Sequence, residues 1–376
     1  MSTKYHVVLQ DSIGNERLLV SEIINLSYAR RLNSIGALTL EIPDIILPNQ
    51  VTKDWRVIVW RTAENHQPYI DMNCFWLVES VSYNYDLETW TIKASDFLSI
   101  LNRRIIAYTP ETTYADKTIE ELGTAIPADD MIKAYARENI GPLSLNPDRD
   151  LSEYIEIEAD LSQGPLVEKK ASFANLFSTF VEISRLSEEL GTPLYFDFEP
   201  NGNRLVLRTF VYTYDVNTEE YSTRKVFYPG INLKNTIITW DYSQEVTRIY
   251  GGGAGSGAGR LILQRTNTER LDVSPWNIVE HFLDLGDTEF DETDYANDEM
   301  DQVIRARAPK MIIQSELINS EGSVYGIDYQ YKDTVAINIS GRRVPSIIEA
   351  VNVTYSPGSL EKERVIASIK GQMDIL

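Results

Sequence analysis

Alternation of hydrophobic and polar residues marks the first hundred residues as antiparallel β-structure. Turn signals such as Ser12-Ile13-Gly14-Asn15 separate runs that are rich in β-branched and aromatic residues. The predicted strands cover residues 4–10, 16–22, 37–43, 55–62, 74–85 and 89–96. A short helix is expected at 97–106, where Asp96 is placed to cap it. Many short strands closed by one helix are typical of a small barrel or sandwich.

The pattern changes after Arg104, where helical periodicity replaces alternation. Short helices are expected at 115–126 and 129–139, and a longer one at 172–190. The longer helix has one apolar face, with Ser172 as its N-cap and Gly191 at its end. A β-hairpin is predicted across Pro200-Asn201-Gly202-Asn203, between strands at 193–199 and 204–214.

Strand patterns return from about residue 232. The predicted strands are 235–243, 246–252, 259–266, 334–340, 346–356 and 363–371, and a helix at 294–308 is stopped by Pro309. The chain is therefore expected to be α+β, mainly β, in three parts. These are residues 1–104 and 232–376, both rich in β-structure, and an α+β part at 105–231 between them.

The charge and cysteine content exclude several classes of protein. The 376 residues carry a net charge of −21, which disfavours binding to nucleic-acid phosphates or to an anionic membrane. The single cysteine, Cys74, excludes an intramolecular disulfide and lies among apolar residues as a structural thiol. The first residues lack the pattern of a secretion signal, and no run approaches the ~20 apolar residues of a membrane span. We expect folding in a cytoplasm.

The stretch YGGGAGSGAG, residues 250–259, is the most unusual in the chain. Its glycines are Gly251, Gly252, Gly253, Gly255, Gly257 and Gly259. Residues 253–258 match a loose dinucleotide fingerprint, but that site needs a helix directly afterwards, and residues 260–269 alternate like a strand. Arg260-Leu261 also replaces the Lys-Ser or Lys-Thr of a P-loop. A flexible hairpin connection without a cofactor is predicted.

No other motif indicates a catalytic or metal centre. The acidic run at 284–301 fits a calcium loop poorly, because Glu292 stands where the sharp turn needs glycine. His6, His66 and His281 lack metal-ligand spacing, and no G-x-S-x-G motif occurs. Two alternatives stay open at this point: a cell-wall hydrolase that uses paired carboxylates, and a carbohydrate-binding module that uses the abundant tyrosines.

Three stretches give the chain a family resemblance. LSYARRLNSIGALTLEIPD (26–44), FWLVESVSYNYDLETWTIKASDFLSILNRRII (75–106) and YGIDYQYKDTVAINISGRRVPSIIEAVNVTYS (325–356) resemble, in this order, conserved passages of bacteriophage tail-hub and baseplate-hub proteins. Two departures stand out. Ala94-Ser95-Asp96 lacks the glycine that often precedes the aspartate, and Lys332-Asp333 replaces the usual Gly-Asp.

The resemblance implies a structural protein of the virion, with no cofactor and no catalytic residue. Two barrels similar to the tail-tube protein, separated by the α+β insertion, would form a homotrimeric ring. That ring would adapt a six-fold tube to a three-fold tip and let DNA pass. Its partners would be the tube proteins above it and the tip, fibre or tape-measure proteins below it. The six glycines become the candidate inter-subunit loop of the second barrel.

Overall fold

The computed structural model describes residues 3–374, except 16, 21, 44–50, 64–65, 108–125, 145, 168, 170, 172, 213–224, 287–292 and 319. The chain is mainly β with a smaller share of helix, and its strand pairs are predominantly antiparallel. This confirms the expected α+β, mainly β class.

One 13-stranded sheet runs through both ends of the chain. Its strands are β1 (Lys4–Gln10), β2 (Arg17–Val20), β3 (Asn25–Arg31), β4 (Ser34–Pro43), β5 (Arg56–Thr62), β6 (Tyr69–Asn84), β7 (Thr89–Asp96), β13 (Val226–Phe227), β14 (Leu233–Asp241), β18 (Lys310–Leu317), β19 (Thr334–Ile339), β20 (Arg342–Tyr355) and β21 (Glu363–Asp374). The order is β14-β18-β21-β20-β3-β4-β7-β6-β5-β1-β2, with β13 and β19 branching from β20. The path is open, with β14 and β2 at its ends.

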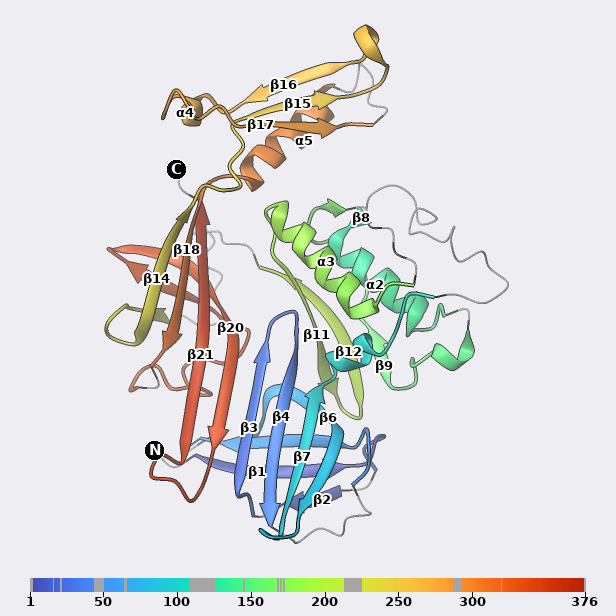
Figure 1. Cartoon of the computed structure of the whole chain (residues 1–376), viewed down its shortest axis with the longest axis vertical. Coiled ribbons are helices and arrows are strands. Elements are labelled where there is room, and N and C mark those ends of the chain that lie inside the picture. The colour runs from blue at the N-terminus through green and yellow to red at the C-terminus, as the bar shows by residue number, and fades with distance from the viewer. Residues whose placement is uncertain are drawn as a thin grey trace.

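The two halves of this sheet meet where β20 pairs antiparallel with β3, in a register from Ala350↔Arg31 to Tyr355↔Leu26. Side chains alternate across the pleat, so every second residue of β3 and β4 enters the same core. That core also receives buried side chains from β20 and β21, and it is therefore shared by residues more than 300 positions apart in the chain. Figure 1 shows β20, β21, β3 and β4 side by side.

The α+β part packs beside β5 and β6 and has its own hydrophobic cluster. Its elements are β8 (Ile126–Pro127), α2 (Ala128–Asn139), β9 (Ile155–Ile157), β10 (Leu166–Val167), α3 (Leu176–Glu189), β11 (Leu194–Asn201) and β12 (Arg204–Val211). The short helix α1 (Leu98–Asn102) precedes this part in the chain and contacts α3. The predicted hairpin is confirmed: β11 pairs with β12 up to Asn201↔Arg204, and Gly202 in the turn has φ +62°.

Helix boundaries differ from the expected ones. The long helix starts at Leu176, because the Asn175 side chain accepts a hydrogen bond from the Ser178 amide at 3.0 Å and caps it there. Phe173, expected on the apolar face of the helix, lies outside it and is exposed. The helix expected at 115–126 lies, up to residue 125, outside the described residues.

The C-terminal half contains a separate three-stranded sheet that stands at one end of the long axis (Figure 1). It consists of β15 (Arg248–Gly252), β16 (Ile262–Thr266) and β17 (Glu280–Asp284), with α4 (Thr268–Leu271) in a connection and α5 (Thr293–Ala306) on one face. The sequence predicted the helix and two of these strands but not β17, and it also missed β18.

Candidate functional site

The three family-like stretches converge on one group of buried charges, which we call the ionic joint: Arg30, Asp96, Asp197 and Lys332. Arg30 on β3 pairs with Asp96 on β7 at 3.1 Å, between Nε and Oδ2. Arg30 also pairs with Asp197 on β11, and Lys332 pairs with the same carboxylate. The joint therefore ties both halves of the main sheet to the α+β part.

The joint accounts for one of the two departures from the family-like pattern, the lysine at position 332. Lys332 has φ +74°, the left-handed conformation that favours glycine, and its Nζ lies 3.1 Å from Glu199 Oε1 in addition to its pair with Asp197. The ion pairs thus hold a lysine in glycine's conformation. Ser95 lies within β7, where glycine is not needed. Gly36 is required instead: its amide donates to Asp96 Oδ2 at 2.9 Å, and an added Cβ would lie 2.7 Å from the Ala29 carbonyl oxygen.

Burial and charge act in opposite directions on the carboxylates of the joint. Burial favours the neutral form of Asp197, but Arg30 and Lys332 outweigh it and lower the pKa of that carboxyl. For Asp96, burial dominates over Arg30 and raises the pKa. Burial also raises the pKa of the adjacent Cys74, whose Sγ donates to the Phe75 carbonyl oxygen. These groups are enclosed structural partners, and Cys74 is not a nucleophile.

A second buried network links the same two halves of the sheet. Asp71 on β6 accepts hydrogen bonds from the hydroxyls of Tyr28 and Tyr325, the latter at 2.7 Å. Arg61 on β5 donates to the Tyr325 carbonyl oxygen at 2.8 Å and pairs with Glu363 on β21 at 2.9 Å. The tyrosines at 325, 329 and 331 are all buried. They pack and donate hydrogen bonds inside the protein, so they offer no exposed platform to a sugar.

The glycine stretch lies in the separate sheet, and its members differ in their surroundings. Gly251 and Gly252 belong to β15, and the predicted hairpin connection to β16 follows them. An added Cβ on Gly251 would lie 2.6 Å from Leu285 Cδ1 and 2.7 Å from Met300 Sδ, because α5 packs closely there. Gly255 and Gly257 turn the chain with φ of +98° and +58°, whereas Gly259 faces open space. The first glycines therefore serve packing and the later ones the turn.

One face of this sheet is covered and the other is open. Ile249 of β15 packs against Met300 of α5 in a small core. On the opposite face, Phe282 is 51% exposed and lies beneath the Arg260 guanidinium, 5.4 Å from its ring centroid. Ile262 on the neighbouring strand is also half exposed. Further exposed apolar side chains occur on the nearby edge strand β14 and in the α4–β17 connection: Ile237, Trp240, Val273, Trp276 and Ile278. Such a surface is typical of a protein–protein contact.

The side chains that the structure describes form no cluster suited to a metal ion. They include no group of three or more His, Cys, Asp or Glu side chains that could hold a metal ion. His6 and His281 lie on β1 and β17, in different sheets, and His66 follows β5. The acidic residues between 287 and 292, which fit a calcium loop poorly in the sequence, fall outside the described residues. In the part of the chain that the structure describes, no helix is both long and apolar enough for a membrane crossing.

Comparisons with known proteins identify the fold. No protein-family model matches the chain, and no curated protein matches its sequence. The prophage tail protein gp18 from Listeria monocytogenes EGD-e aligns over 96% of this chain and 94% of its own, with a TM-score of 0.51 and 12% identity. The tail protein from Neisseria meningitidis MC58 aligns over 99% of this chain and 96% of its own, with a TM-score of 0.51 and 10% identity. The chain has the fold of phage tail proteins, and the resemblance to the tail-hub family is confirmed at that level.

Proposed function

We propose that this protein is the structural hub of a phage tail tip or baseplate and acts by assembly, not by catalysis. The observation that carries the proposal is the ionic joint: the three hub-like stretches, far apart in the sequence, meet in one buried group within a fold shared along its length with phage tail proteins. The protein would fold in the host cytoplasm and end in the virion.

In this proposal, residues 1–104 and 232–376 each supply a barrel similar to the tail-tube protein, with 105–231 inserted between them. The two halves of the main sheet, joined at β20 and β3, support this division. Three copies would place six such units around one axis and match a six-fold tube to a three-fold tip. Neighbouring tube, tip, fibre or tape-measure proteins would bind above and below.

The net charge fits the passage of DNA through the ring. Three chains would carry 3 × (−21) = −63 charges. An acidic lumen repels phosphates, so DNA slides through without binding.

The glycine hairpin is proposed as an inter-subunit element. Its sheet stands apart from the main sheet, and its open face presents apolar side chains such as Phe282 and Ile262. Removing residues 253–259 and joining the strands with a two-residue turn tests this role. We expect an unchanged melting temperature for the main sheet together with a loss of assembly. Normal assembly of the shortened protein would mean that the hairpin is only a spacer and makes no inter-subunit contact.

A further inference from the structure

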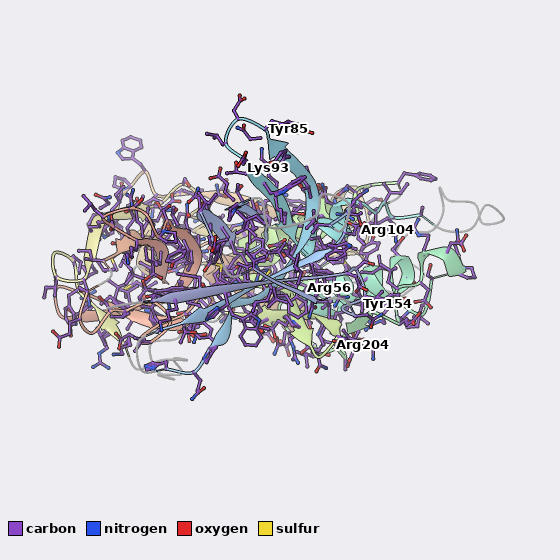
Figure 2. All side chains as sticks on the ribbon, turned by 90° about the horizontal axis from the view of Figure 1, so that it is seen from below. Arg56, Tyr85, Lys93, Arg104, Tyr154 and Arg204 are labelled. Carbon is purple, nitrogen blue, oxygen red and sulfur yellow. The ribbon has the colours of Figure 1, made fainter. Side chains whose placement is uncertain are left out.

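A cavity of about 610 Å³ lies between the first β-strands and the α+β part. Its wall combines apolar side chains, among them Phe97 and Tyr154, with the guanidinium groups of Arg56, Arg103 and Arg104. Figure 2 shows Arg56 and Tyr154 close together in the body of the protein, with Arg104 nearby. Asp54 also lines the cavity, so its wall carries three cations and one carboxylate in a chain whose net charge is −21.

The charges of this cavity are only partly balanced. Arg103 pairs with Asp54 at 2.6 Å. Among the described residues, neither Arg56 nor Arg104 has a carboxylate within ion-pair distance of its side chain. Arg56 is 3% exposed, donates from one terminal nitrogen to the Asn203 carbonyl oxygen at 3.1 Å, and leaves its buried Nε without a hydrogen-bond partner. Burial lowers the pKa of Arg56, and the charge of Asp11 offsets this only in part. A buried cation with so little compensation is costly, so the cavity is suited to an anionic group next to an apolar one.

The turn between β6 and β7 has the complementary chemistry. Its tip presents Leu87, 69% exposed, between the exposed carboxylates of Asp86 and Glu88. The Asn84 side chain accepts from the Asp86 and Leu87 amides at 3.0 and 3.2 Å, which fixes the shape of the tip. The strands pair up to Asn84↔Thr89, and Figure 2 shows Tyr85 at the end of a hairpin that projects from the body, away from Arg56.

We infer that this cavity receives the β6–β7 tip of a second copy of the chain, with Leu87 against its apolar wall and the flanking carboxylates facing Arg56 and Arg104. The tip points away from the cavity of its own chain, so the contact joins two different surfaces on neighbouring subunits. Contacts of this head-to-tail kind form a ring when the rotation between neighbouring subunits closes, and an open filament when it does not. The inference rests on the ring arrangement of the proposed function and names a surface that would hold the ring together.

Cross-linking between two single-cysteine variants tests the contact in the full-length protein. The native Cys74 is buried, so Leu87→Cys and Tyr154→Cys each supply one reactive thiol. Mixed and oxidised, the two variants are expected to give a disulfide-linked dimer. The control pair is Leu360→Cys, fully exposed in the β20–β21 turn, with Tyr154→Cys. We expect the Leu87 pair to give at least about tenfold more mixed dimer than the control pair, because only the proposed contact brings the two thiols together. A yield equal to the control overturns the inference.

Charge reversal gives a second, independent readout. Arg104→Glu, added to the Tyr154→Cys chain, should lower the cross-link yield about tenfold through like-charge repulsion. Glu88→Lys, added to the Leu87→Cys chain, should restore it. Native mass spectrometry of the same variants without oxidation separates the two proposals. Closed trimers from a pair of variants whose cross-link yield equals that of the control overturn the tip contact and leave the hub. A specific cross-link between variants that form no closed trimer supports the contact and contradicts the ring.

Discussion

Replacing Asp197 with asparagine is the sharpest test of the ionic joint. The substitution preserves the shape of the side chain but removes the charge shared by Arg30 and Lys332, whose side chains are 2% and 16% exposed. Breaking a buried ion pair from one side typically costs ~3–5 kcal/mol, because the partner charge remains buried. Arg30 keeps its 3.1 Å contact with Asp96, and Lys332 keeps its contact with Glu199. We therefore expect a loss of about 3 kcal/mol in the free energy of unfolding, at the lower end of that range.

Equilibrium urea unfolding, followed by tryptophan fluorescence, measures this loss. Asp160→Asn is the matched control: Asp160 pairs with Arg137 at 2.8 Å, but its side chain is 47% exposed. A surface pair of this kind contributes less than about 1 kcal/mol. If Asp197→Asn costs no more than Asp160→Asn, the joint does not hold the parts of the protein together.

The same variant should change how stability depends on pH. Because Arg30 and Lys332 lower the pKa of Asp197 against the effect of burial, the stabilisation by this carboxylate is complete above its unfolded value of ~3.9. It is lost as the pH falls through the lower folded value. Asp96, whose pKa burial raises, contributes with the opposite sign in both proteins. The wild-type protein should therefore lose more unfolding free energy below about pH 4 than Asp197→Asn does; identical acid slopes would refute this.

Three further experiments probe the backbone and the surface. Lys332→Ala should lower the free energy of unfolding by ~1 kcal/mol more than Lys332→Gly. Both variants lose the ion pairs, but only alanine keeps the strain of the left-handed conformation. Equal urea midpoints for the two variants would contradict this. Gly251→Ala should destabilise the sheet of β15, β16 and β17 by ~1–3 kcal/mol through overpacking. Gly259→Ala is the control, because an added methyl group at Gly259 meets open space. Limited proteolysis of this sheet compares the two variants, and equal cleavage rates would contradict the packing role of Gly251. The double substitution Ile262→Ser and Phe282→Ser should change the melting temperature by less than about 2 °C. It should also prevent assembly, which electron micrographs would show. Intact assemblies would mean that the open face of this sheet does not contact a neighbouring subunit.

Local patterns predicted those elements whose determinants lie close together in the sequence. The β11–β12 hairpin follows from Asn201-Gly202 between two alternating runs, and α2 follows from its helical periodicity. The start of α3 was wrong because Ser172 and Asn175 both suit an N-cap, and only the fold selects Asn175. β18 was missed although Ile313, Ser315 and Leu317 alternate towards the interior, a pattern that the serine obscures.

The candidate sites depend on residues that the fold brings together. Arg30 and Asp197 are 167 positions apart, and each alone reads as an ordinary charged residue on a strand. The family-like stretches include Arg30, Asp96 and Lys332, but not Asp197, which pairs with both Arg30 and Lys332. The cavity around Arg56 is likewise lined by a strand, a short helix and the α+β part, so no spacing of residues in the sequence could predict it. The glycines were found by composition, while the packing role of Gly251 needed α5 in place.

Electron cryomicroscopy of the assembled protein, with native mass spectrometry of the same sample, tests the hub proposal most directly. The predicted result is a trimer that forms a ring with an open centre, six barrel-like units around its axis and acidic side chains along the lumen. A protein that stays monomeric both alone and with its neighbouring tail proteins, or a ring whose lumen is basic, would contradict the proposal.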